Sequence, residues 1–309
     1  MSNEVYSFDL KKYHAKGGEG PHIVITGAIH GVEQTATYTA ELVWENLKRE
    51  KLLGEVTIYP LCNLHAAKAN ERGAPEDGLD LNRIFPGNPC GSYSEQLASH
   101  IYGLTAGADY ILDLHCCGVY GSAYTMCWYS RHGFARELCR ALGIPVVVHT
   151  KGTRGQFYIE SCEERGQKCL LVELPGGQPN GVIDVPSAEL TAARIMNYLK
   201  YIGVIEGEGR LSDDVLFCGT MDENNKSSCD GLCEPAVLPG GFVEKGQAMA
   251  FVNGEPFVAP YDAVVTAAPP KRYIFQGSEI VSFAPRAEVQ PGEVVYRERD
   301  ESGSNKGKV

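Results

Sequence analysis

The strongest constraint on the fold is an alternation of short apolar runs with segments of helical period through the first two thirds of the chain. The apolar run at 23–29 ends in a tight turn, and apolar residues then recur at helical spacing from Ala36 to Leu47. By the same criteria, strands are expected at 56–62, 110–114, 124–129, 145–149 and 169–174, and helices at 94–104, 134–142 and 187–201. Strands that are apolar on both faces need cover on both sides. We therefore predict a three-layer α/β/α domain over residues 1–205, with a mostly parallel or mixed central sheet.

The texture of the sequence changes after residue 205. Residues 206–230 are polar and lack apolar period, which predicts a linker. Short β-rich pieces punctuated by Gly and Pro follow at 236–238, 248–252, 263–266 and 279–283, which predict a small all-β domain over residues 231–290. Residues 291–309 are charged and are expected to form a frayed tail.

Charge and composition exclude several classes of protein. Twenty-eight basic against 39 acidic residues give a net charge of −11, so nucleic acid is not an expected partner. The chain has no apolar run long enough to span a membrane and no secretory signal at its start, so the mature chain is expected to begin near Met1. Eleven cysteines, an odd number in a long chain, favour reduced thiols and a cytoplasmic location. A homo-oligomer remains compatible with all of this.

Two histidines and a glutamate end predicted strands of the first domain. His30 and Glu33 follow the first strand, and His115 closes the strand that contains Asp113. Open α/β sheets bind ligands beyond such strand ends, and two His with one Glu leave a fourth zinc position open for water. Taken singly, His30 and Glu33 also fit a surface histidine and a helix-start glutamate, and His115 fits a hydrogen-bonded strand end. Asp113 shares a strand face with His115 and could orient it.

A second set of polar residues lies in a long loop and after a later strand. Arg72 and the run Asp80-Leu81-Asn82-Arg83 occupy a loop rich in Gly, Pro, Asp and Asn, and Glu173 ends the apolar strand near residue 172. The arginines could be surface residues, and Glu173 could be a solvated or helix-capping carboxylate. A carboxylate leaving an apolar strand toward the ligand face is costly without a partner or a task, which favours a functional Glu173.

Several motifs together resemble one family. GAIHGVE, NLHAAKANERG, DLNRIFPG, LDLHCC and LLVELPGG occur in the order and context of the succinylglutamate desuccinylase and aspartoacylase family, the amidohydrolase relatives of zinc carboxypeptidases. The resemblance covers about residues 20–205 and implies a zinc carboxypeptidase-like fold.

The resemblance also implies roles for individual residues. It places one zinc ion per chain on His30, Glu33 and His115, the water-activating carboxylate at Glu173, oxyanion stabilisation at Arg72, binding of a substrate carboxylate at Asn82 and Arg83, and a second carboxylate near Arg154 and Tyr158. Zinc with one glutamate carries a net charge of +1, which with the arginines would make the site attractive to a small anionic substrate. Cobalt, manganese and nickel suit the same ligands.

These roles predict a zinc-dependent amidohydrolase that removes an acyl group from a small N-acyl amino acid or a related carboxylate-bearing substrate. The alternatives are a metallocarboxypeptidase acting on short peptides and a non-catalytic binding protein of the same fold. The C-terminal region resembles the barrel-sandwich hybrid of biotinyl and lipoyl domains, but the turn at 253–257 lacks their modified lysine. We therefore expect no covalent cofactor there, and a lid or assembly role instead.

Overall fold

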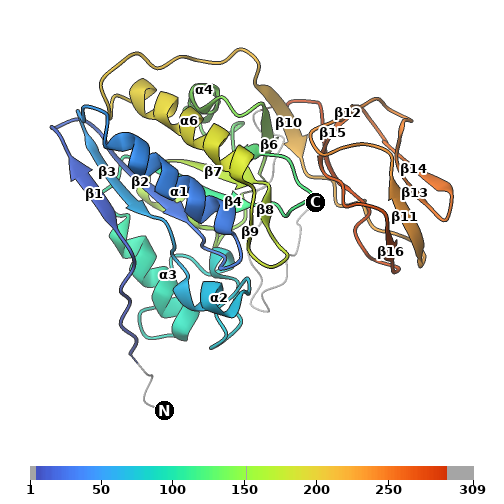
Figure 1. The fold of residues 1–309 in the computed structure, drawn as a ribbon, viewed down its shortest axis with the longest axis horizontal. Coiled ribbons are helices and arrows are strands. Elements are labelled where there is room, and N and C mark those ends of the chain that lie inside the picture. The colour runs from blue at the N-terminus through green and yellow to red at the C-terminus, as the bar shows by residue number, and fades with distance from the viewer. Residues whose placement is uncertain (1–4, 151, 291–309) are drawn as a thin grey trace.

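The main sheet of the computed structural model forms the centre of the molecule (Figure 1). The model describes residues 5–150 and 152–290, and within them eight strands follow the order β1-β3-β2-β4-β7-β5-β6-β10. These strands are β1 (Tyr13–Lys16), β2 (His22–Gly27), β3 (Glu55–Tyr59), β4 (Tyr110–Cys116), β5 (Tyr124–Cys127), β6 (Val146–His149), β7 (Lys168–Leu174) and β10 (Leu216–Thr220). The sheet is mixed, because β1 runs antiparallel to β3, and β5 antiparallel to β7.

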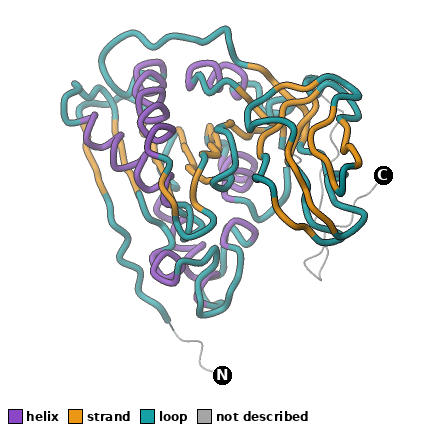
Figure 2. The backbone as a smooth tube through the Cα atoms, turned by 45° about the vertical axis from the view of Figure 1, so that its right-hand side comes forward, coloured by secondary structure: helices purple, strands orange, loops and turns teal. Residues whose placement is uncertain are grey.

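Helices lie on both sides of this sheet (Figures 1 and 2). They are α1 (Gln34–Leu47), α2 (Leu64–Ala69), α3 (Tyr93–Leu104), α4 (Ala135–Leu142), α5 (Phe157–Arg165), α6 (Val185–Tyr201) and the 3₁₀ turn η1 (Leu81–Arg83). Helices α1 and α6 pack against each other, and α1 also packs on β2 and β4. This arrangement confirms the predicted three-layer α/β/α fold.

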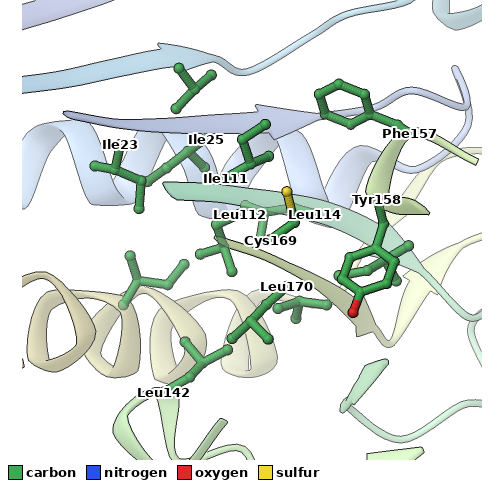
Figure 3. Packing of buried hydrophobic residues seen from close by; sticks show 14 of the residues in the cluster. Ile23, Ile25, Ile111, Leu112, Leu114, Leu142, Phe157, Tyr158, Cys169 and Leu170 are labelled. Carbon is green, nitrogen blue, oxygen red and sulfur yellow. The ribbon is translucent and has the colours of Figure 1, made fainter. Parts of the chain in front are cut away.

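The core explains why the central strands are apolar on both faces. Ile23, Ile25, Ile111 and Leu112 lie on β2 and β4, and none of them is exposed to solvent (Figure 3). Fully burying one such side chain stabilises the fold by roughly 1.5–3 kcal/mol. The central strands therefore hold the ends that carry the polar residues in fixed positions.

Two smaller sheets form the C-terminal β region, residues 231–285. One sheet has the order β14-β13-β11-β16 and the other β12-β15-β17. Their strands are β11 (Gly231–Pro235), β12 (Phe242–Val243), β13 (Ala248–Val252), β14 (Glu255–Val258), β15 (Ala263–Ala267), β16 (Arg272–Ile274) and β17 (Ser282–Pro285). Outside this region, β8 (Gly176–Gly177) and β9 (Val182–Ile183) form a separate two-stranded sheet. Figure 1 shows this region beside β10 at one end of the main sheet.

The predicted linker over 206–230 is corrected in one respect. Strand β10 lies inside that range and pairs in parallel with β6 as the edge of the main sheet. Its sequence, LFCGT, is short and flanked by polar residues, so it carries little periodic signal. The predicted tail at 291–309 lies outside the described residues.

Within the described residues, no helix has the length and apolar character needed to cross a membrane. All eleven cysteines lie in the described part of the chain and are free thiols.

The stability of the edge of the sheet should depend on pH through His149. This residue ends β6, is 1 % exposed, and places Nε2 2.8 Å from the Ser130 hydroxyl. Burial, helped by the charge of Arg136, lowers the pKa of His149 from 6.5 to about 4. As the pH falls, His149 is therefore protonated in the unfolded chain before it is protonated in the folded protein. Its contribution to the free energy of unfolding is complete above pH 6.5 and is lost as the pH falls toward 4.

We expect that loss to reach on the order of 3 kcal/mol. The measurement is the free energy of unfolding of the protein and of His149→Gln by urea titration between pH 4 and 8, with the exposed His14→Gln as a matched control. Parallel pH dependences for the protein and for His149→Gln would contradict this assignment.

Candidate metal centre and its cavity

The site lies at the carboxyl ends of three neighbouring parallel strands. Strand β2 leads into the turn that carries His30 and Glu33, β4 carries His115, and β7 carries Glu173. In the register of β4 and β7, His115 stands directly opposite Glu173. Residues that are 58 positions apart in the chain therefore share one end of the sheet, as the predicted strand ends require.

A strained turn presents His30. Ala28, which is fully buried, has φ +48°, in the left-handed region that costs a non-glycine residue about 1–2 kcal/mol. The amides of Cys62 and Asn63 donate to the carbonyls of Gly27 and Ala28, at 2.9 and 3.0 Å. Asn63 also caps α2 through its side chain. These bonds fix the strained backbone and tie the turn to α2.

Gly31 is required by the closeness of that helix. A Cβ at this position would lie 2.2 Å from the backbone carbon of Ala66. The amide of Gly31 also donates to the carbonyl of Arg72 at 3.2 Å. The turn with His30 and the loop with Arg72 are therefore held together through α2.

Three buried side chains converge on a single point. His30 Nδ1 lies 2.8 Å from Glu33 Oε1, His115 Nδ1 lies 2.9 Å from Glu33 Oε2, and the two Nδ1 atoms are 3.2 Å apart. One ligand atom from each residue falls within 4.8 Å of the others. Each of the three residues is no more than 2 % exposed.

These residues fit a divalent metal ion. Buried Glu33 Oε2 has no hydrogen bond of acceptable geometry among the described residues, although His115 Nδ1 lies 2.9 Å from it. Two ring nitrogens that face each other beside a carboxylate form a set of lone pairs that a cation would satisfy, and nitrogen and oxygen donors of this kind suit zinc. Two imidazoles and one carboxylate leave a coordination position open.

Two further carboxylates orient the imidazoles. His115 Nε2 lies 2.9 Å from Asp113 Oδ2, and His30 Nε2 lies 2.9 Å from Asp80 Oδ1. Asp113 is fully buried and accepts a second hydrogen bond from the Thr26 hydroxyl at 2.8 Å. A carboxylate on the far nitrogen fixes the tautomer that leaves the lone pair of Nδ1 available to a metal and makes that nitrogen more basic.

The electrostatics of the three residues agree with this arrangement. Burial alone would raise the pKa of Glu33, but His30 and His115 lower that pKa to about 2, so the carboxylate stays ionised. Burial opposes protonation of His115, yet Asp113 and Glu33 raise its pKa well above 6.5. The two buried carboxylates, Asp113 and Glu33, therefore favour a positive charge at His115, either a proton or a bound cation.

Glu173 is a separate, less acidic carboxylate in the same cavity. Burial raises the pKa of Glu173 to about 7, and the negative charge of Glu33 adds to that effect while His115, His30 and Arg72 oppose it. A carboxyl group with a pKa near neutrality can both take up and release a proton at physiological pH.

The loop that follows α2 brings three more predicted residues to this point. Arg72 Nε donates to Asp80 Oδ2 at 3.1 Å, and a terminal nitrogen of Arg72 lies 3.5 Å from Glu33 Oε1. Asn82 is held by the amide of Phe157, which donates to Asn82 Oδ1 at 2.8 Å. Arg83 donates to the carbonyl of Asn82 at 2.8 Å and, in the part of the chain that the structure describes, makes no ion pair with a carboxylate.

One cavity of about 490 Å³ is lined by the three predicted metal ligands and by Glu173, Arg72, Asn82 and Arg83. Its walls include Cys116 and Cys117, which follow His115 directly. The outer wall comes from the loop after β10 and from the C-terminal β region, through Met221, Asp222, Glu223, Asn225, Lys226, Thr266, Ala267, Glu279 and Ser282. We call Asp222, Glu223, Lys226 and Glu279 the charged rim; it has three carboxylates and one ammonium group.

The structure does not bring Arg154 and Tyr158 to this cavity. Arg154 pairs with Glu160 at 3.0 Å and also contacts Glu164. The hydroxyl of buried Tyr158 contacts the amide of Trp128 and His132 Nδ1, both at 2.9 Å. Arg154 and Tyr158 were expected at the substrate only because they precede Glu173 in the chain.

The charged rim is absent from the sequence prediction. Its residues lie in the polar stretch predicted as a linker and in the C-terminal β region, and no motif connects them with His30 or His115. The only signal in the sequence was the polarity of these residues next to a predicted lid. Their contact with the cavity depends on how the C-terminal β region packs against the α/β domain.

The chain is similar to known proteins over the segment that contains the predicted metal ligands. The model of the succinylglutamate desuccinylase/aspartoacylase catalytic domain matches residues 19–202. An N-alpha-acetyl-L-2,4-diaminobutyric acid deacetylase of Halomonas elongata is 31 % identical over 248 residues, which cover 77 % of this chain and 72 % of that protein.

Solved structures show the same fold. The product-bound ectoine utilization protein EutE (DoeB) from Ruegeria pomeroyi is 25 % identical, has a TM-score of 0.74, and the match covers 89 % of this chain and 88 % of that one. A succinylglutamate desuccinylase from Silicibacter is 22 % identical with a TM-score of 0.76, and the match covers 91 % and 92 % of the two chains.

Asp113→Asn should weaken metal binding without unfolding the protein. An amide keeps an oxygen for the Thr26 hydroxyl but removes the charge that polarises His115, so we expect the affinity for zinc to fall about 10- to 100-fold. Titration of the metal-free protein with zinc against a chelator measures this. Asp109→Asn, just before β4 at its other end, is the matched control, and equal zinc affinity in the Asp113→Asn variant would contradict the orienting role.

Proposed function

Because the chain belongs to the succinylglutamate desuccinylase/aspartoacylase family, we propose that it is a zinc-dependent deacylase that hydrolyses the amide bond of a small N-acyl amino acid. The observation that carries the proposal is the convergence of His30, Glu33 and His115 in one cavity with Glu173 and Arg83. A hydrolase of this type needs a metal ion, a general base and a group that binds the substrate, all within a few ångströms of one another.

The metal would be held by His30, Glu33 and His115. When bound, it supplies Lewis acidity that lowers the pKa of water and polarises an amide carbonyl. Glu173 accepts the proton of the attacking water and then delivers it to the nitrogen of the leaving amine. Its pKa near 7 suits both steps.

Arg72 and Arg83 interact with different negative charges of the proposed substrate. Arg72 lies 3.5 Å from the predicted ligand Glu33, and its fixed positive charge would stabilise an oxyanion formed beside the metal ligands. Arg83 lines the cavity, and its planar guanidinium would hold the carboxylate of the amino acid with the donors that do not contact the Asn82 carbonyl. Asn82, buried and fixed by the amide of Phe157, keeps Arg83 in place through its carbonyl.

The charged rim bears on which amino acid is released. Three carboxylates against one ammonium group give the outer wall a negative field, and Lys226 lies within 3.5 Å of Glu279. A substrate whose side chain carries a second carboxylate would be repelled there, whereas a side-chain amine would be attracted. We propose an N-acetylated diamino acid as the substrate, the class named for the relative from Halomonas elongata.

Free thiols at all eleven cysteines support a reducing, cytoplasmic setting for this enzyme.

Glu173→Gln should strongly reduce turnover while metal remains bound. Glutamine has nearly the same shape but cannot take up the proton of water, so we expect kcat to fall at least about 100-fold with one metal ion per chain retained. Metal analysis and steady-state kinetics of the purified variant measure the two quantities. Glu163→Gln, outside the cavity, is the control, and normal activity in Glu173→Gln would remove Glu173 from the mechanism.

A substrate series tests the function itself. With the zinc-loaded protein, we expect kcat/KM for N-α-acetyl-2,4-diaminobutyrate to exceed that for N-acetylaspartate and N-succinylglutamate by about tenfold or more, because one well-placed charge contact is worth 1.4 kcal/mol or more. Release of acetate or succinate is measured by mass spectrometry.

Glu279→Gln should narrow that difference, while the exposed Glu234→Gln in β11 should not. A preference for the dianionic substrates would contradict the role of the charged rim. Faster cleavage of a dipeptide set than of any N-acyl amino acid would favour the metallocarboxypeptidase alternative.

A further inference from the structure

Two cysteines outside the metal-centre cavity contact each other where α5 turns into β7. Cys162 lies in the last turn of α5, and Cys169 lies near the start of β7, seven positions later. Gly166, at φ +67°, ends the helix, and its amide donates to the carbonyl of Cys162 at 3.1 Å. The chain therefore folds back on itself, and the Cys162 sulfur accepts hydrogen bonds from the thiol and from the backbone amide of Cys169.

The two thiols differ in their access to solvent. Cys162 is 9 % exposed, whereas Cys169 is completely buried among the apolar side chains of the core (Figure 3). Of this pair, only Cys162 can meet a small solute, and Cys169 is the thiol in contact with it.

A histidine connects Cys162 with the protein surface. His132 forms a hydrogen bond with the Cys162 side chain, and its Nε2 lies 2.8 Å from Glu163 Oε1. Glu163 in turn pairs with the exposed Arg131 at 2.6 Å. An imidazole held between a thiol and a carboxylate favours an imidazolium beside a thiolate, the surroundings in which cysteines become reactive.

The two thiols also differ in acidity. The hydrogen bond from the Cys169 thiol, opposed by burial and aided by His132, lowers the pKa of Cys162 to about 6. Burial and the contact with Cys162 raise the pKa of Cys169 well above 9. Burial opposes protonation of His132, but Cys162 and Glu163 raise its pKa above 6.5. The pair therefore combines a nucleophilic thiolate with a protonated thiol that touches it.

A second pair of thiols gives a comparison within the same protein. Cys127 Sγ and Cys139 Sγ are 3.5 Å apart, but neither residue is exposed. Burial raises the pKa of Cys139 well above 9. Contact between two thiols is therefore common to both pairs, whereas exposure and a charged partner belong to Cys162.

The cluster around Cys162 is not a further metal site. Within the described residues, only His30, Glu33 and His115 bring three ligand atoms within 4.8 Å of one another. Neither Cys162 nor Cys169 lines the metal-centre cavity, so their chemistry is separate from the proposed deacylase activity.

From this geometry we propose that Cys162 and Cys169 form a redox-active dithiol that hydrogen peroxide oxidises to a disulfide. The Cys162 thiolate attacks one oxygen of the peroxide, the O–O bond breaks, and Cys162 becomes a sulfenic acid. The departing hydroxide takes a proton from His132 and becomes water. The sulfur of Cys169 then attacks the sulfenic sulfur, an S–S bond forms, and hydroxide leaves with the Cys169 proton as a second water. Two thiols lose the two electrons that the peroxide gains, and a dithiol reductant reverses the change.

Peptide mapping of the zinc-loaded protein after limited treatment with hydrogen peroxide at pH 7 tests this assignment. Trypsin releases Cys162 and Cys169 in separate peptides, 155–165 and 169–194, each with a single cysteine. We expect mass spectrometry without reduction to find these two peptides joined, with the loss of two hydrogens, before any other pair. Treatment with dithiothreitol should separate them again.

Variants distinguish the roles of the two thiols. Cys169→Ser should leave Cys162 as a sulfenic acid that dimedone traps, whereas Cys162→Ser should leave Cys169 reduced. His132→Gln should slow the oxidation of Cys162 at least about tenfold, because the thiolate loses its positive partner. Cys229→Ser, which removes an exposed thiol, is the matched control and should form the cross-link at the rate of the unchanged protein.

The exposed thiols Cys90 and Cys229 set the scale for the rate. We expect Cys162 to be oxidised at least about tenfold faster than either, because the thiolate is the reacting form. Oxidation of the exposed thiols before Cys162 would overturn the proposal. So would a cross-link between Cys127 and Cys139 that forms as fast as the one between Cys162 and Cys169.

Discussion

The structure depends on a carboxylate buried between two imidazoles. Glu33 is 2 % exposed and ionised, and the cost of such a charge in the interior is several kcal/mol unless opposite charge and hydrogen bonds offset it. His30 and His115 supply part of that compensation, but their ring nitrogens also face each other at 3.2 Å. A divalent ion satisfies all three groups together, which is why the arrangement makes physical sense as a metal site and less as a salt bridge.

Asp80 joins that centre to the residues that face the substrate. Its carboxylate accepts the amide of Asn82 at 2.9 Å and two hydrogen bonds from Arg72, and it lies 2.9 Å from His30. One side chain therefore orients a proposed metal ligand, fixes the proposed oxyanion donor and begins the 3₁₀ turn that presents Arg83. The long loop is also anchored by apolar side chains, because Ala74, Leu81 and Phe85 are buried in the main hydrophobic core.

The sequence predicts the part of the site that lies at strand ends. His30, Glu33, His115 and Glu173 follow apolar runs, and parallel strands bring such ends together whatever their exact order. The strand order itself was not predictable, because β5 lies between β7 and β6, antiparallel to β7 and parallel to β6, through contacts distant in the chain.

Other elements have weak local signals. Helix α5, FYIESCEER, is short and starts with aromatic and β-branched residues, and β10 is a five-residue edge strand in a polar stretch. The placement of Tyr158 in the core follows from its hydrogen bonds to Trp128 and His132, which no spacing rule reveals. Packing between distant segments, and not propensity, decides each of these.

With a divalent ion bound, the two ends of the metal-centre cavity would carry opposite charge, and this polarity follows from how the chain is divided. The inner end is built by the α/β layers, where the ion with Arg72 and Arg83 would outweigh the charge of Glu33; the outer end is built by the loop after β10 and the C-terminal β region, where carboxylates dominate. A zwitterionic substrate with a free carboxylate and a distant amine gains at both ends, but only in one orientation. In that orientation the acyl amide of the proposed substrate would lie between Arg83 and the predicted metal ligands, next to Glu173. On this proposal, the C-terminal β region would select and align the substrate without touching the reacting atoms.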